Sequence, residues 1–165
     1  MGTLLAPFSE RGKAEALGAW ARSAGALHWA GVVLDGAHVD FVLRAVMQEL
    51  SADARCAARP VVVLALGPDK NAAAMVGVLA GAATWVVCTR AGGGRAGLAP
   101  RQLQQCCASH GIPSEAIDAP HVALARALDA VGDGGWVLVT GSLHLAGTLR
   151  ASLAACTSAP GGSGS

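Results

Sequence analysis

Short apolar runs alternate with amphipathic stretches along the chain from about residue 30. The apolar runs show little apolar–polar alternation, which is typical of parallel strands covered on both faces, and amphipathic stretches between such runs are typical of crossover helices. The pattern predicts an α/β domain in three layers, with a mostly parallel sheet of about five to six strands. The predicted strands are Ala30–Leu34, Val61–Leu66, Thr84–Thr89, a weak one at Ser114–Asp118, and Trp136–Thr140.

The stretches between these strands show the periodicity of helices. Apolar residues from Val39 to Leu50 recur at the spacing of one helical face, and Asp40 and Arg44 lie on the opposite face, where an ion pair would stabilise the helix by only about 0.3 kcal/mol. Four further helices are predicted. They are a weak helix before Thr84, a helix from about Pro100 to Gly111, a helix that begins at Asp118 and Pro120 and ends before Gly132, and a helix at Leu143–Ala155.

The two ends of the chain differ from the middle in composition. Residues 1–25 are rich in Ala and Gly and are predicted to be a lead-in or linker with a short helix at Glu10–Leu17. Residues 157–165 are predicted to be a flexible tail, because Gly and Ser dominate them. The length of 165 residues suits one domain, which we place at residues 26–156.

Composition and charge exclude several classes of protein. The chain is 53% hydrophobic and 14% charged, as a globular protein is, and its net charge of +1 gives no field that would gather nucleic acid or anionic lipid. Residues 71–89 carry no charge, but they are mostly Ala and Gly, and Gly77, Gly81 and Thr84 divide them into a helix and a strand. We therefore predict no membrane insertion and no nucleic-acid partner.

Cysteine usage points to a reducing environment. The chain has five cysteines with no C-x-x-C pair, and its first residues do not form a secretory signal, which predicts free thiols in a soluble intracellular protein, in the cytoplasm or in an organelle such as a mitochondrion or plastid. Cys106, Cys107 and His110 share a helical face and are alternatives for a metal site, but they continue the apolar stripe of Leu103. No metal site is predicted.

Three loops at predicted strand ends hold the candidate chemistry, because ligands of parallel sheets bind at the carboxyl ends of the strands. Asp35–His38 places a carboxylate and an imidazole in one loop, although Asp35 alternatively caps the next helix. Gly67–Asn71 contains Lys70, one of few lysines, and ends in a competent N-cap. Thr140–His144 offers backbone N–H groups and Ser142 to an anion, or Ser142 is an ordinary N-cap.

These loops, in this order, resemble the C-terminal domain of the folylpolyglutamate synthase/dihydrofolate synthase family, a branch of the Mur-type ATP-dependent amide ligases with a Rossmann-like fold. The family's Asp-Gly-Ala-His motif matches Asp35–His38, its Asp-Lys loop matches Asp69–Asn71, and its Gly-Ser-Leu-Tyr/His element matches Gly141–His144. Its Thr-Arg strand end matches Thr89 and Arg90, and an arginine before the first strand matches Arg22. The resemblance covers about Ala19 to Leu153.

The resemblance implies a function and roles for these residues. Enzymes of the family phosphorylate a folate carboxylate with ATP, and the amino group of glutamate then attacks the acyl phosphate. By position, Arg22, Asp35, His38 and Lys70 would form the nucleotide side of the site, with Asp35 and His38 as candidates for catalysis, and Ser142 would lie near the incoming glutamate. ATP and Mg²⁺ are expected only when a domain carrying a phosphate-binding loop is present.

The sequence departs from the family pattern at several points, and these departures indicate an alternative function. The sequence contains no G-x-x-x-x-G-K-[ST] motif, and the family's Asn-Pro after the histidine is replaced by Val39 and Asp40. We therefore expect a ligase-family domain that is inactive alone and needs a partner protein or a missing N-terminal domain. The alternative is a catalytically retired domain that serves as a structural subunit of a larger assembly. A third option is a small-ligand binding module that uses the same crevice.

Overall fold

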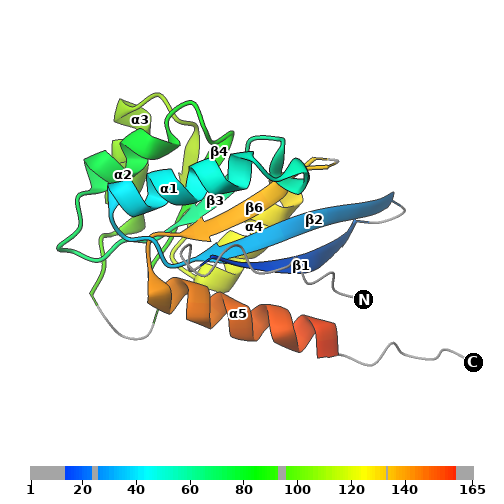
Figure 1. The fold of residues 1–165 in the computed structure, drawn as a ribbon. Coiled ribbons are helices and arrows are strands. Elements are labelled where there is room, and N and C mark those ends of the chain that lie inside the picture. The colour runs from blue at the N-terminus through cyan, green and yellow to red at the C-terminus, as the bar shows by residue number, and fades with distance from the viewer. Residues whose placement is uncertain (1–13, 24–25, 93–95, 133, 159–165) are drawn as a thin grey trace, which may run out of the picture.

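The described part of the chain forms a sheet of six strands, in the order β1-β2-β6-β3-β4-β5 (Figure 1). The computed structural model describes the backbone of residues 14–23, 26–92, 96–132 and 134–158, and the side chains of residues 31–92, 96–132, 134–151 and 153. Strands β2 to β6 are parallel, and β1 is antiparallel to β2. The strands are β1 (Ala14–Ser23), β2 (Ala26–Asp35), β3 (Val61–Leu64), β4 (Trp85–Cys88), β5 (Ser114–Ala116) and β6 (Trp136–Thr140).

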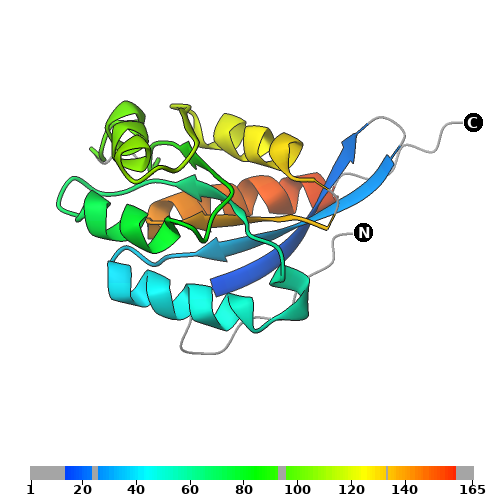
Figure 2. The same cartoon turned by 90° about the horizontal axis from the view of Figure 1, so that it is seen from above.

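Helices cover both faces of the sheet and complete the three predicted layers (Figures 1 and 2). The first three α-helices contribute to one hydrophobic core and the last two to the other. The helices are α1 (Asp40–Ser51), the short η1 (Ala54–Cys56), α2 (Ala72–Leu79), α3 (Pro100–Ser109), α4 (Pro120–Ala130) and α5 (Leu143–Ser158).

Burial on both faces explains why the strands lack apolar–polar alternation. Leu138 of β6 belongs to the core cluster that contains Leu43 and Met75, whereas its neighbour Val139 belongs to the cluster that contains Leu145. All five residues of β6 are buried. Every position of this strand therefore has to be compatible with a dry environment, whichever face it points to.

Most predicted elements are confirmed, with changes at their ends. The strand Trp136–Thr140 is observed as predicted, and the predicted apolar face of α1 buries Leu43, Val46 and Leu50. The uncharged run at 71–89 is divided into α2 and β4, as its glycines predict. Within the described residues, no helix has the combined length and apolarity that a membrane crossing requires.

The segment before β2 is the clearest correction. Residues 14–17 belong to β1, so the helix predicted at Glu10–Leu17 is wrong there, and residues 10–13 lie outside the described chain. Strand β1 pairs with β2 over its whole length, and the hairpin extends beyond the rest of the sheet because β2 pairs with β6 only from Gly31 onward (Figures 1 and 2). The sheet thus begins inside the predicted lead-in.

The end of the chain differs less from expectation. Helix α5 continues to Ser158, past the predicted end at Ala155, and residues 159–165 of the predicted tail lie outside the described chain. The division into lead-in, domain and tail at residues 25 and 156 stays a prediction.

Candidate functional site

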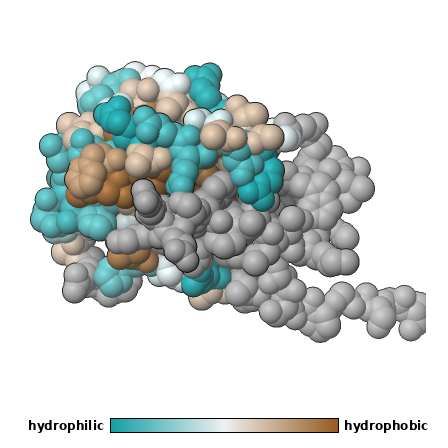
Figure 3. Space-filling view, in the orientation of Figure 1, coloured by the Kyte–Doolittle hydropathy of each residue, from teal (hydrophilic) through white to brown (hydrophobic). Residues whose placement is uncertain are grey.

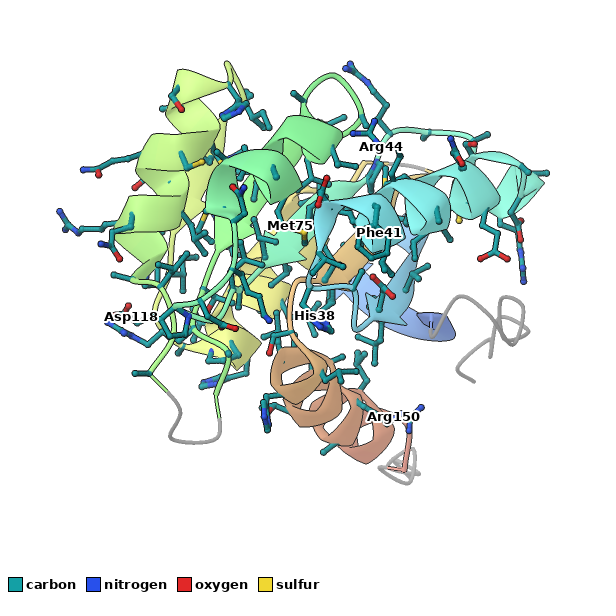
Figure 4. All side chains as sticks on the ribbon, turned by 60° about the vertical axis from the view of Figure 1, so that its left-hand side comes forward. His38, Phe41, Arg44, Met75, Asp118 and Arg150 are labelled. Carbon is teal, nitrogen blue, oxygen red and sulfur yellow. The ribbon has the colours of Figure 1, made fainter. Side chains whose placement is uncertain are left out.

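The loops that follow β2, β3 and β6 meet at the carboxyl edge of the sheet and line a cavity of about 260 Å³. These three strands are neighbours in the sheet, with β6 in the middle, so their carboxyl ends lie side by side. His38, Lys70 and Ser142 all line the cavity, as the sequence analysis expects of residues at one sheet edge. Figure 4 shows His38 between the beginning of α1 and the beginning of α5.

The His38 ring is held by its own loop. Its Nδ1 lies 3.0 Å from the carbonyl oxygen of Gly36. A carbonyl oxygen only accepts hydrogen bonds, so Nδ1 carries the proton and Nε2 of the neutral ring keeps its lone pair. A Cβ at Gly36 would lie 2.2 Å from Cδ2 of Leu143, so glycine lets the first residue of α5 pack against this loop.

Asp35 is not among the residues that line the cavity. The side chain is fully buried, and its Oδ2 accepts hydrogen bonds from the backbone N–H of Ala37 at 3.0 Å and from Oγ1 of Thr140 at 2.9 Å. Oδ1 has no hydrogen-bond partner among the described residues. Burial raises the pKa of this carboxyl group, although the two hydrogen bonds oppose the rise.

The alternative that Asp35 caps the following helix is wrong. The N-cap residue of α1 is Val39, and no side chain caps this helix end. Asp35 precedes that N-cap by four residues and turns inward to the neighbouring strand end instead, so it joins β2 to β6.

Lys70 contributes a positive charge to the cavity wall. Its Nζ lies 3.0 Å from Oδ2 of Asp69, and the side chain of Lys70 is 26% exposed against 71% for Asp69. The hydrogen bond from Lys70 lowers the pKa of Asp69. An arriving anion could exchange with a carboxylate that is this exposed, because exposed ion pairs are weak. Asn71 is the predicted N-cap of α2, and its Oδ1 accepts the N–H of Ala74 at 3.0 Å.

The third loop is fixed by close contacts between strand ends. Ser142 Oγ accepts the N–H of Leu145 at 3.3 Å and so caps α5, which was one of its two predicted roles. Gly141 has a φ of 96°, and a Cβ there would lie 2.1 Å from the carbonyl oxygen of Ala65. The N–H of Gly141 donates to the carbonyl of Ala37 at 2.8 Å, which binds the first loop to the third.

Arg22 is not brought to the other four predicted residues. Its backbone pairs with Leu27 near the tip of the β1–β2 hairpin, whereas Asp35 pairs with Ala14 at the other end. The reason is that β1 runs antiparallel to β2. The last residues of β1, just before the turn of the hairpin, therefore lie beside the first residues of β2, at the amino edge of the sheet. The side chain of Arg22 lies outside the described part.

The Thr89–Arg90 strand end and the cysteine stripe of α3 make contacts inside the described fold. Arg90 Nε lies 3.1 Å from Oδ1 of Asp118, and Thr89 Oγ1 donates to the Asp118 carbonyl at 3.1 Å, which ties the end of β4 to the start of α4. Cys107 is fully buried, with its Sγ 3.9 Å from that of Cys88. Among the described residues no three His, Cys, Asp or Glu side chains are arranged to hold a metal ion, and the described cysteines are free thiols.

Several residues of the cavity are not indicated by the sequence as site residues. Leu143 and His144 appear in it only as part of a motif, and Gly97 comes from a loop to which the sequence assigns no role. The N–H of Leu98 donates to the carbonyl of Leu66 at 2.9 Å, which brings this loop beside the end of β3. No local signal predicts that contact. The position of Leu143 directly after Ser142 was a usable signal, since a residue in the first turn of α5 must lie at the rim.

Comparison with known proteins identifies structures with the same fold. No family model matches this sequence, and no curated protein matches it. Solved structures do match. A folylpolyglutamate synthase from Mycobacterium tuberculosis, complexed with ADP, is 25% identical with a TM-score of 0.66 over 80% of this chain and 30% of that chain.

Two further structures give the same result. The bifunctional folylpolyglutamate synthase/dihydrofolate synthase of Yersinia pestis is 21% identical with a TM-score of 0.63 over 76% of this chain and 29% of that chain. The folylpolyglutamate synthase of Thermotoga maritima is 23% identical with a TM-score of 0.61 over 76% and 28%. The chain thus has the α/β fold of one part of the folylpolyglutamate synthases, spanning about 30% of their length, in agreement with its resemblance to their C-terminal domain.

Proposed function

We propose that this chain is the glutamate-ligase C-terminal domain of a folylpolyglutamate synthase-like enzyme, which adds glutamate to folates at the expense of ATP. The observation that supports this most is the convergence of His38, Lys70 and Ser142 on one cavity at the carboxyl edge of the sheet. A cation, a ring nitrogen with a defined proton and a hydroxyl group are suited to phosphate and carboxylate groups.

Each of these groups has a distinct capacity in the proposed reaction. Lys70 attracts an anionic oxygen, and it can leave Asp69 for a ligand. Nε2 of His38 can accept a proton or orient a hydroxyl group, because Nδ1 is already bound to Gly36. Ser142 Oγ accepts the Leu145 N–H, which leaves its own O–H to donate. Together they can bind and orient the acyl phosphate that the amine attacks, with inorganic phosphate as the leaving group.

The chain needs a second protein domain for this chemistry. Phosphoryl transfer requires a phosphate-binding loop and a held Mg²⁺, and the sequence has no motif for the former. The cavity of about 260 Å³ is also smaller than most small-molecule sites, which have about 300–1,000 Å³. We therefore expect ATP and Mg²⁺ to bind only where an ATPase domain, joined to the chain or separate, closes over this edge.

An elongation assay tests the proposal. The purified chain is incubated with ATP, Mg²⁺, glutamate and a reduced folate, with and without a candidate partner that carries a phosphate-binding loop. We expect no added glutamate without the partner and elongation with it, and we expect Lys70→Ala to lower the rate of the reconstituted reaction. Elongation by the chain alone would contradict the claim that a second domain is required. Failure with every phosphate-loop partner would contradict the ligase function.

A second function is favoured by the position of Asp35. Oδ2 of its carboxylate joins β2 to β6, and the side chain does not line the cavity. Val39, in place of the family's asparagine, is the N-cap of α1. A retired domain that serves as a subunit of a larger assembly would need only such structural roles. Native pull-down with mass spectrometry distinguishes the two: a phosphate-loop partner supports the ligase, and recovery only in an assembly without one supports the structural subunit.

A further inference from the structure

A second cavity, of about 390 Å³, lies at the amino edge of the sheet. It is lined by Trp136, the first residue of β6, and Pro60, which precedes β3, together with parts of α1 and α2. Parallel strands place their amino ends at one edge and their carboxyl ends at the other. This amino-edge pocket is therefore separate from the site proposed above.

The floor of the amino-edge pocket is apolar and uncharged. Trp136 is 3% exposed, and its indole N–H donates to the Ala58 carbonyl at 2.6 Å, so the ring offers only its apolar surface. Met47 and Val78 continue this surface from α1 and α2. Cys56 also lines the pocket, and burial raises the pKa of its thiol to about 11, which keeps the thiol neutral near pH 7.

Two guanidinium groups stand at the rim of this floor. Arg44 comes from α1 and Arg59 from the segment before β3, and both are exposed. In Figure 4, Arg44 lies on the side of α1 away from His38. Nη1 of Arg59 donates to the carbonyl of Gly81 at 3.5 Å, just past the end of α2, where backbone carbonyls favour a cation.

No carboxylate neutralises these two arginines among the described side chains. None of the described residues that line the pocket is acidic. The described ion pairs do not include Arg44 or Arg59, and the predicted pair between Asp40 and Arg44 is not among them. The rim of the pocket is thus positively charged, in a chain whose net charge is only +1.

We propose that the amino-edge pocket binds a small organic anion with an apolar body. The anionic group would lie between Arg44 and Arg59, and the apolar body would lie on Trp136 and Met47. The volume of about 390 Å³ is in the usual range for such ligands, about 300–1,000 Å³. This site is independent of the proposed ligase function.

The test uses two fluorescent probes of nearly the same shape, anilinonaphthalenesulfonate and the uncharged phenylnaphthylamine. We expect the double variant Arg44→Met, Arg59→Met to bind the sulfonate about tenfold more weakly, because it loses charge-assisted hydrogen bonds that solvent exposure already weakens. The uncharged probe should bind the double variant and the parent chain equally. Arg101→Met, which changes an exposed arginine on α3, should leave both affinities unchanged.

A variant that fills the amino-edge pocket tests whether the probes bind there. Ala82→Leu places a larger side chain in the lining of the pocket and should weaken both probes, while the circular dichroism spectrum shows that the fold is kept. The proposal is overturned if the arginine variant binds the sulfonate like the parent chain, if both probes weaken equally in it, or if Ala82→Leu leaves both affinities unchanged.

Discussion

The carboxyl group of Asp35 is held inside the fold, where it connects the ends of two neighbouring strands. The residue lies at the carboxyl edge of the sheet, as its place after an apolar strand predicts, but its carboxylate is fully buried and bound to Thr140 and Ala37. Thr140 is 105 residues away in the sequence, so no local pattern indicates the contact. His38 and Lys70 could be placed in the cavity from sequence because their position needs only the order of strand and loop.

The buried Asp35 should make the stability of the protein depend on pH. Its pKa in the folded protein is raised above the ordinary 3.8, so between these two pKa values the folded protein binds more protons than the unfolded chain. The contribution of Asp35 to the unfolding free energy therefore falls as the pH rises through this interval. Urea unfolding of Asp35→Asn and of the parent chain from about pH 4 to pH 7 measures it.

We expect the unfolding free energy of the parent chain to fall relative to that of Asp35→Asn as the pH rises. Other titrating groups are shared by the two proteins and cancel in the difference. A difference that stays constant over this range would show that the Asp35 carboxyl group has no raised pKa.

Gly141 is a residue whose identity the fold dictates. Its positive φ and the nearby carbonyl of Ala65 both exclude a side chain. We expect Gly141→Ala to lower the unfolding free energy by about 2–4 kcal/mol. Gly147→Ala is the matched control, because nothing lies within 4 Å of a Cβ there and the residue is helical, so it should raise stability by about 0.5–1 kcal/mol. Equal effects of the two substitutions in thermal unfolding would contradict this account.

At the level of elements, burial decided which strands the sequence could predict. Strand β6 is buried on both faces and its five residues were predicted without error. Strand β1 has the sequence AEALGAWARS, whose alanines favour helix, and it is a strand because all ten residues pair with β2. Pairing with a neighbour is tertiary information, so periodicity could not indicate it. The ends of helices were easier, since Pro100 and Pro120 each begin one.

Helix α5 depends on its first turn, where Ser142 is the N-cap. We expect Ser142→Ala to lower the unfolding free energy by about 1 kcal/mol, because the N–H of Leu145 loses its acceptor. Ser142→Asn keeps an acceptor at the same position and should retain most of this stability. Chemical unfolding of both variants is the measurement, and a Ser142→Ala variant as stable as the parent chain would rule out the capping role.

On the scale of the molecule, the carboxyl edge presents apolar surface beside its polar cavity. Phe41 in the first turn of α1 is 70% exposed, and Leu143 in the first turn of α5 is 58% exposed. Figure 3 shows apolar surface where α1 begins and a smaller apolar area near the start of α5. Exposed large apolar side chains at the rim of a small cavity are suited to contact with another protein body.

A contact with the proposed phosphate-loop partner is tested by changing both residues. We expect Phe41→Ser with Leu143→Ser to reduce recovery of the partner in native pull-downs by about tenfold, since central apolar side chains dominate binding at interfaces. Val122→Ser is the control, because Val122 is 45% exposed but lies on α4. Unchanged recovery with the double variant, or an equal loss with the control, would place the partner elsewhere.

The position of β6 has a consequence for how the protein is made. This strand lies between β2 and β3, yet it comes last in the sequence among the described strands. On the ribosome, the β1–β2 hairpin and the β3–β4–β5 part emerge before the strand that joins them, and apolar edges of both parts remain uncovered until then. Premature termination before Trp136 would leave two incomplete sheets with unpaired edges, which are the kind of product that aggregates or is recognised by chaperones.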